Sequence, residues 1–298
     1  APPPPGRSPA GRPGRRVGPV SPRRLRPSAI EITPGSTPIA RMVRPRLLAL
    51  EGDEQPGERE RWRDRLLPGG RRDRPRRVRS PGGSNTGTMV IIGVCVVVFL
   101  AELAQGVSIS GISGSSLVAD GALFGPAVAE GEWWRLVTSS FLHASLIHVG
   151  FNMYLLWLLG SALEGYAGTD RFLAVWFTAV LWGAAGALVL SPNAITVGAS
   201  GGVFGLMAAI FLLERQRGMG LMQSQVGILL LLNLGITFVL PGISIGGHLG
   251  GIVGGAAAAF VLSGFGKGSI AYGQITPVIA TSMAVLTAGA IAVSFAAV

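Results

Sequence analysis

Cysteine, histidine and charged side chains are scarce in this chain of 298 residues. Cys95 is the single cysteine, so an intramolecular disulfide is excluded and the redox compartment stays undetermined. Only 13% of the residues are charged, whereas 49% are hydrophobic. This composition does not fit a single soluble domain. The sequence instead joins two parts of different composition.

The first part, residues 1–87, holds 20 Arg against 8 acidic residues, with Pro and Gly in nearly every short run. It cannot bury enough apolar surface to offset the entropy of ordering, so we expect a disordered, solvated cytoplasmic tail. The alternative is a polybasic arm that touches anionic lipid or nucleic acid. Because Trp62 stands alone, without aromatic interleaving, we expect no nucleic-acid partner. The chain opens with Ala1 and not Met, which we interpret as a fragment or a translation start placed too far upstream.

The second part is a series of apolar stretches, each near the ~20 residues that a membrane-spanning helix needs. Seven stretches are visible: 89–104, 148–164, 172–190, 200–213, 226–240, 245–263 and 277–296. Their apolar residues run without alternation, which favours helices over strands in lipid. We therefore predict an all-α polytopic membrane protein. The late position of these stretches does not fit a secretory signal peptide.

The few basic residues of this part predict its orientation, because Lys and Arg in short loops stay on the cytoplasmic side. With the N-terminus inside, four of them share that side: Arg171, Arg215, Arg217 and Lys267. The C-terminus is then outside. In this topology His148, Ser200 and His248 all open their spans from the outer face. Polar side chains are costly in a membrane, so their convergence on one face indicates a functional site.

Ser200 is the candidate nucleophile of this site. Gly198 and Gly201 flank it and allow close approach to the backbone, and the free N–H groups of a helix's first turn favour negative charge. A nucleophile and its developing oxyanion need both properties. The competing interpretation, which spacing alone favours, is that Gly201 and Gly205 only pack helices together.

His248 is the candidate base, because a serine hydroxyl is a weak nucleophile until a base can take its proton. On a helix, His248 shares one face with Gly251 and Gly255, a bare stripe that lets another helix come close. If that helix carries Ser200, the two side chains can form a hydrogen bond. The alternative, a structural histidine on an apolar face, stays open.

His148 and Asn152 are spaced i, i+4, so both project from one side of their helix. Each offers an N–H donor, which suits them to stabilise an oxyanion opposite the nucleophile. A zinc site is the competing idea. No histidine is paired with a carboxylate or a second histidine at ligand spacing on one helix, so we expect neither a metal nor a cofactor.

From about residue 132 to residue 255 the chain resembles the rhomboid family of intramembrane serine proteases. Four short motifs carry the resemblance: Trp134-Arg135, then His143 with His148 and Asn152, then Gly198-Ala199-Ser200-Gly201, and finally His248-Leu249-Gly250-Gly251 leading to Gly255. It implies a six-helix core over residues 88–264. A linker and a seventh span over 265–298 resemble the longer members of the family. Residues 1–87 lie outside the resemblance.

The resemblance also implies roles for the site residues. Ser200 would attack the scissile carbonyl, and His248 would act as general base and then as general acid, a dyad without a carboxylate. His148, Asn152 and the backbone N–H of Ser200 would form the oxyanion hole. Because the acid of a Ser-His-Asp triad is missing, ring stacking and helix packing would have to fix the imidazole tautomer.

Other residues would support this dyad. Phe204 would stack on the histidine, at a position where the family often has Tyr. Arg135 would brace the first outer loop, and Glu164 would anchor the inner end of the second span. The remaining supporting residues are Gly198, Gly201, Gly251, Gly255 and His143.

The expected substrate is a transmembrane helix of another membrane protein, unwound locally and cleaved near its outer end after a small residue. Hydrolysis needs water, so we expect a cavity open to the outer side. These features imply a multi-pass protein of a bacterial plasma membrane, whose oligomeric state the sequence does not indicate.

Two rival functions remain. A transporter would also show Gly-rich, interrupted helices, but the acids within the spans, Glu102 and Glu164, lie near span ends and no internal repeat is visible. A rhomboid-like pseudoprotease would bind membrane clients without cutting them. The sequence contains all four candidate catalytic residues, Ser200, His248, His148 and Asn152, so it shows no sign of the loss that would mark a pseudoprotease.

Overall fold

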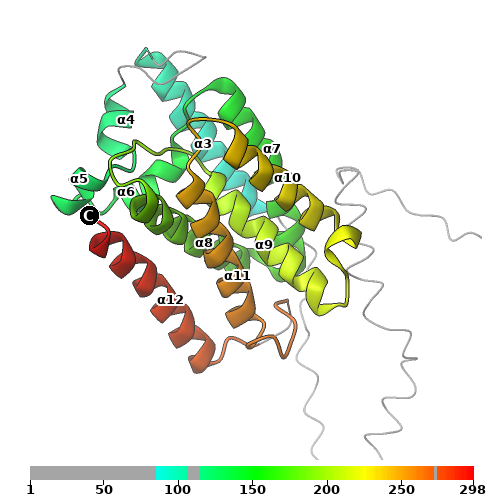
Figure 1. The fold of residues 1–298 in the computed structure, drawn as a ribbon. Helices are drawn as coiled ribbons and strands as arrows, with labels where there is room; N and C mark the ends of the chain where they lie inside the picture. Colours follow the sequence, from blue (N-terminus) through cyan, green and yellow to red (C-terminus); the bar gives the residue numbers. More distant parts are fainter. Residues whose placement is uncertain (1–84, 107–114, 272–273) are drawn as a thin grey trace, which may run out of the picture. The chain divides into compact units, whose positions relative to one another are not determined.

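The computed structural model describes residues 85–106, 115–271 and 274–298, and in these ranges the chain is helical. The long helices are α3 (Thr86–Ala104), α7 (Leu146–Ala167), α8 (Thr169–Leu190), α9 (Ser200–Gln216), α10 (Gln225–Val239), α11 (Ile245–Leu262) and α12 (Pro277–Ala296) (Figure 1). The short elements are α4 (Ser116–Gly121), α5 (Gly125–Ala129), α6 (Arg135–Thr138) and the 3-10 turns η1 (Ser139–Phe141) and η2 (Leu221–Gln223). The described residues form no strand, only an isolated bridge between Leu123 and Thr196. The all-α prediction is confirmed.

Five of these helices are long and apolar enough to cross a membrane: α3, α7, α8, α11 and α12. The other two predicted spans correspond to shorter helices, α9 with 17 residues and α10 with 15. At 1.5 Å per residue, α10 is only about 22 Å long, less than the ~30 Å of a hydrocarbon core. The count of seven spans therefore stays a prediction, as do the predicted domain limits. The tail predicted over residues 1–87 lies outside the described residues up to residue 84, whereas its last residues, Thr86 and Gly87, begin α3.

Side-chain caps explain where several helices begin. In each case a hydroxyl in front of the helix accepts a hydrogen bond from a backbone N–H of the first turn, which otherwise has no partner inside the helix. The caps are Ser145 before α7, Ser224 before α10, Ser244 before α11 and Thr276 before α12. The polar residues that bound the apolar runs thus start the helices.

Helices α8, α9 and α11 form the centre of the bundle, and α12 lies along α8 and α11 (Figure 1). Glycines bring α8 and α11 into backbone contact. A Cβ atom on Gly246 would lie 2.1 Å from the carbonyl oxygen of Gly186, and one on Gly250 would lie 2.1 Å from that of Trp182. Any larger side chain would have to push the helices apart, because real Cβ atoms do not approach oxygen so closely.

Glu164 ties the far end of α7 to two neighbouring helices. Its carboxylate accepts hydrogen bonds from the backbone N–H groups of Gly87 and Thr88 at 2.8 Å each, and from the Thr88 hydroxyl at 2.7 Å. The hydroxyl of Thr169, at the start of α8, donates to it at 2.7 Å. A fully buried carboxylate is thus satisfied by the first turns of α3 and α8, where unpaired N–H groups favour negative charge.

We expect the substitution Glu164→Ala to lower the free energy of unfolding by about 3 kcal/mol, because it leaves buried donors of α3 without an acceptor. Glu164→Gln keeps one acceptor oxygen and should lose less than half as much. Thermal unfolding of the detergent-solubilised variants measures both. Equal stability of Glu164→Ala and the parent chain would contradict an anchoring role.

Candidate active site

Ser200 is the first residue of α9, and two residues before it the backbone adopts a conformation that requires glycine. Gly198 has a φ of +125°, and its N–H donates to the carbonyl oxygen of Ser139 at 2.9 Å. A Cβ atom at this position would lie 2.7 Å from Cε1 of His148. Gly198 therefore turns the chain into α9 and also lets the imidazole of His148 lie against the backbone just before Ser200.

The side chains of Ser200 and His248 meet between α9 and α11. The Ser200 Oγ lies 2.8 Å from the Nε2 of His248, although the two residues are 48 positions apart. The glycine stripe makes this approach possible. A Cβ atom on Gly251 would lie 2.1 Å from the carbonyl oxygen of Gly201, and one on Gly255 would lie 2.2 Å from that of Gly205. The sequence-predicted nucleophile and base are thus within hydrogen-bonding distance.

The imidazole of His248 is held on two further sides. Phe204 stacks on it, with ring centroids 4.1 Å apart and an angle of 24° between the planes. The Oγ1 of Thr237, on α10, lies 2.7 Å from its Nδ1. Sequence reasoning identified Phe204 but missed Thr237. The available signal was the spacing of Asn233 and Thr237, four residues apart in an otherwise apolar stretch.

His148 and Asn152 lie on α7, with the side-chain amide of Asn152 donating to the carbonyl oxygen of His148 at 2.9 Å. The Nδ1 of His148 accepts from the backbone N–H of Ala144 at 3.3 Å. A backbone N–H only donates, so the proton of a neutral His148 sits on Nε2. A Cβ on Gly198 would lie 2.8 Å from this Nε2, so the ring's donor nitrogen lies beside the segment that leads into Ser200.

His143 connects the loop before α7 to the segment before α9. Its Nδ1 lies 3.2 Å from the carbonyl oxygen of Phe141, and its Nε2 accepts from the backbone N–H of Ala199 at 3.5 Å. Burial, with a smaller effect from the nearby His148, lowers the pKa of His143 to about 3. It is therefore neutral at physiological pH, with Nδ1 donating and Nε2 accepting. Its ring meets that of His148 edge to face, with centroids 5.3 Å apart.

Glu102 is a second residue that sequence reasoning did not place in this region. Its Oε2 accepts from the backbone N–H of His143 at 3.3 Å, and its side chain is fully buried near the end of α3. It therefore fixes the loop that carries His143. A carboxylate at a span end gave no signal of this contact in the sequence.

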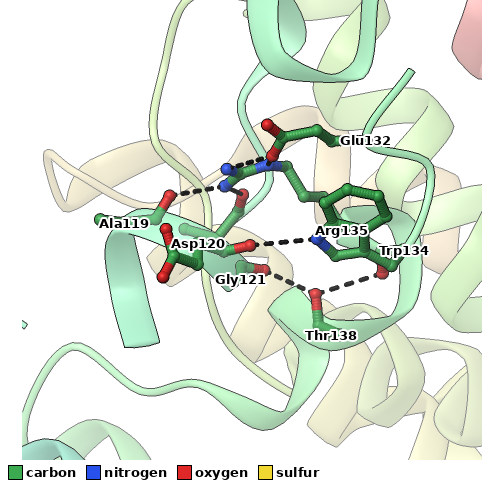
Figure 2. A network of polar contacts seen from close by, with 8 residues as sticks. Ala119, Asp120, Gly121, Glu132, Trp134, Arg135 and Thr138 are labelled. Atoms are coloured by element: carbon green, nitrogen blue, oxygen red, sulfur yellow. Dashed lines mark hydrogen bonds and ion pairs between the residues drawn. The ribbon is translucent and has the colours of Figure 1, made fainter. Parts of the chain in front are cut away.

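Arg135 braces the loop that contains α4, α5 and α6, as Figure 2 shows. Its Nη1 donates to the carbonyl oxygens of Ala119 and Ala122 at 2.8 Å each, and its Nε donates to Glu132 at 2.6 Å. Trp134 adds a hydrogen bond from its Nε1 to the carbonyl oxygen of Asp120 at 3.1 Å. The buried guanidinium of Arg135 thus donates to backbone carbonyl oxygens that accept no hydrogen bond within a helix. These bonds hold the loop in one shape.

In the part of the chain that the structure describes, no three His, Cys, Asp or Glu side chains lie together in a way that could hold a metal ion. The three histidines are engaged by protein groups: His143 by Phe141 and Ala199, His148 by Ala144, and His248 by Ser200 and Thr237. The arrangement of Ser200 and His248 can activate a hydroxyl for attack on a carbonyl carbon.

Comparison with known proteins gives a family match over the same region. A family model described as the rhomboid domain matches residues 130–265. The chain is 34% identical over 184 residues to the rhomboid protease GluP of Bacillus subtilis (strain 168), covering 60% of this chain and 35% of that protein. It is 37% identical over 138 residues to the rhomboid protein YdcA of the same organism, covering 45% of this chain and 69% of YdcA.

A fungal relative shows a similar match. Over 135 residues the chain is 32% identical to rhomboid-type serine protease 2 of Emericella nidulans, covering 43% of this chain and 27% of that protein. The chain thus spans about a third of the length of GluP and about two thirds of that of YdcA. The family-model match includes the segments that carry the serine, the histidines and Arg135, because it runs from residue 130 to residue 265.

Proposed function

This chain belongs to the rhomboid family, and from that premise we propose that it is an intramembrane serine endopeptidase with a Ser200–His248 dyad. The observation that carries the proposal is the 2.8 Å contact between the Ser200 Oγ and the His248 Nε2. The relatives named as rhomboid proteases support the reaction class. Several long apolar helices place the chain in a membrane as a multi-pass protein.

The reaction follows from the contacts of the dyad. His248 takes the proton of the Ser200 hydroxyl through Nε2 while Oγ forms a bond to the scissile carbonyl carbon. The negative charge moves to the carbonyl oxygen, where we assign His148, Asn152 and the Ser200 backbone N–H as donors. His248 then gives its proton to the departing amine as the C–N bond breaks. Water then attacks the acyl carbonyl carbon while His248 takes a proton from it, and His248 gives this proton to the Ser200 Oγ as the ester C–O bond breaks.

The surroundings of the dyad support a site that water can reach. Ser200 and His148 are half-buried, and His248 is 7% exposed. All three lie at or near the starts of α7, α9 and α11, the ends that we assign to the outer face of a bacterial plasma membrane. The N-terminus is then cytoplasmic and the C-terminus outside. The substrate we propose is a transmembrane helix of another protein, cut near its outer end after a small residue.

The test is cleavage of a single-span protein by the full chain in proteoliposomes. We expect a cut within or at the outer edge of the span, located by mass spectrometry, and no cut in a soluble peptide of the flanking sequence. A metal chelator should leave the rate unchanged. Binding of the span without any cleavage would overturn the proposal and indicate a client-binding pseudoprotease instead. A rate abolished by the chelator would also contradict it.

A further inference from the structure

We propose that Thr237 is a positioning residue that holds the neutral His248 in the Nδ1-protonated tautomer. The inference rests on the proposed function, because it concerns the general base of that site. A serine nucleophile needs an unprotonated nitrogen beside its hydroxyl, and in a Ser-His-Asp triad a carboxylate on the other nitrogen ensures this. Here the Nδ1 of His248 contacts a hydroxyl on another helix.

Counting protons assigns the direction of each bond. The Thr237 hydroxyl has one hydrogen, and its Oγ1 donates to the carbonyl oxygen of Asn233 at 2.9 Å, an atom that can only accept. The 2.7 Å contact between Thr237 Oγ1 and His248 Nδ1 then requires the hydrogen to sit on Nδ1. The Nε2 is left with a free lone pair, 2.8 Å from the Ser200 Oγ. That lone pair is what a general base needs.

The opposite direction of this hydrogen bond, with Thr237 as the donor, is incompatible with the reaction. If the Thr237 hydroxyl donated to Nδ1, the proton of His248 would sit on Nε2 and face Ser200, where it blocks proton transfer. This hydrogen bond between Thr237 and His248 would also have to reverse its direction once His248 took up a second proton, because both ring nitrogens of an imidazolium only donate. With Thr237 accepting, the same hydrogen bond is kept in the neutral and the charged states.

The packing around Thr237 keeps its hydroxyl in place. Thr237 is 2% exposed and Asn233 is 8% exposed, although α10 is otherwise a short apolar helix. The side-chain amide of Asn233 donates to the carbonyl oxygen of Leu229 at 2.8 Å. The polar groups of α10 thus run as a line along one side of the helix and end at the imidazole. Polar side chains buried in a membrane protein are costly, which favours a functional reason for this line.

A hydroxyl in this place differs from a carboxylate in one physical respect. It orients the ring without adding a charge to an apolar bundle, where an isolated carboxylate would be strongly disfavoured. It stabilises the imidazolium less than a carboxylate does. Thr237 therefore acts on the tautomer and the ring orientation of His248, and it touches neither the substrate nor the reacting atoms.

The kinetic test compares Thr237→Val, which keeps the shape and removes the hydroxyl, with Thr237→Ser, which keeps the hydroxyl. We expect Thr237→Val to lower kcat roughly 10- to 100-fold with KM changed by less than about 2-fold, and Thr237→Ser to stay within about 3-fold of the parent. The matched control is Thr178→Val, a buried threonine of α8, which should leave kcat unchanged. Parent-like kcat in Thr237→Val would overturn the proposal.

A spectroscopic test reads the tautomer without any substrate. The chain has three histidines, so the ¹⁵N resonances of their rings can be assigned with single His→Gln variants. In the resting protein His248 should show a protonated Nδ1 and an unprotonated Nε2, and Thr237→Val should move the proton toward Nε2. A resting His248 protonated on Nε2 would refute the inference. A chain that cleaves nothing would refute the proposed function alone, since this measurement does not depend on turnover.

Discussion

Ser200→Ala is expected to abolish covalent labelling by a fluorophosphonate probe and to lower the rate of substrate cleavage by ~10⁴-fold or more. The probe reacts with an activated serine oxygen, and the Ser200 Oγ is the oxygen that lies 2.8 Å from a histidine nitrogen. The effects of substituting residues that act as one catalytic unit are not additive. We therefore expect His248→Ala to lower the cleavage rate nearly as much as Ser200→Ala, and the double variant to lower it little further. Labelling is measured on detergent-solubilised full chain by in-gel fluorescence.

The control for this prediction is Ser294→Ala, which removes a fully buried serine of α12 that donates only to the carbonyl oxygen of Ala290. It should label and cleave like the parent chain. We expect the unfolding midpoints of Ser200→Ala and His248→Ala to lie within about 2 °C of that of the parent chain, which is the criterion that both variants are folded. Undiminished labelling of a folded Ser200→Ala variant would remove the dyad from the mechanism.

The positions of the long helices could be predicted because apolar runs and their polar ends are local properties. The predicted stretch 245–263 matches α11, Ile245–Leu262, and the stretch 277–296 coincides with α12. The predicted stretch 148–164 is shorter than α7, because the Ser145 cap starts the helix at Leu146 and the helix continues to Ala167, past the buried Glu164. Local reasoning did not yield α4, α5 and α6, whose arrangement depends on Arg135 and carbonyls 13 and 16 residues away from it.

Part of the candidate site could also be expected from spacing. Glycines at 251 and 255 below His248 predicted a close neighbour, and glycines at 201 and 205 below Ser200 predicted a matching surface. The contact of Thr237 could not be predicted in this way. A threonine in an apolar helix commonly bonds back to its own helix, as Thr237 does to Asn233, and only the packing of α10 on α11 brings its oxygen to His248.

Gly251→Ala is the second substitution with a large expected effect. The added Cβ would lie 2.1 Å from the carbonyl oxygen of Gly201 and 2.8 Å from its carbonyl carbon, both of which belong to the backbone of α9 and cannot rotate away. Helix α9 must move away from α11, and Ser200 lies one residue before Gly201. We expect the free energy of unfolding to fall by about 2 kcal/mol and kcat to fall by roughly 100-fold.

The two effects of Gly251→Ala separate the two interpretations of the glycine stripe. If the glycines only pack helices, activity should fall in proportion to the folded fraction, and lipid or lower temperature that restores folding should restore cleavage. If they also set the distance between Ser200 and His248, the folded variant should remain slow, because a shift near 1 Å is enough to break the hydrogen bond that activates the hydroxyl. Gly93→Ala and Gly235→Ala are the matched controls, since at either helical position a Cβ meets no atom within 4 Å apart from the adjacent backbone of its own helix. Both should retain parent kcat and gain slightly in stability, as alanine favours a helix more than glycine does.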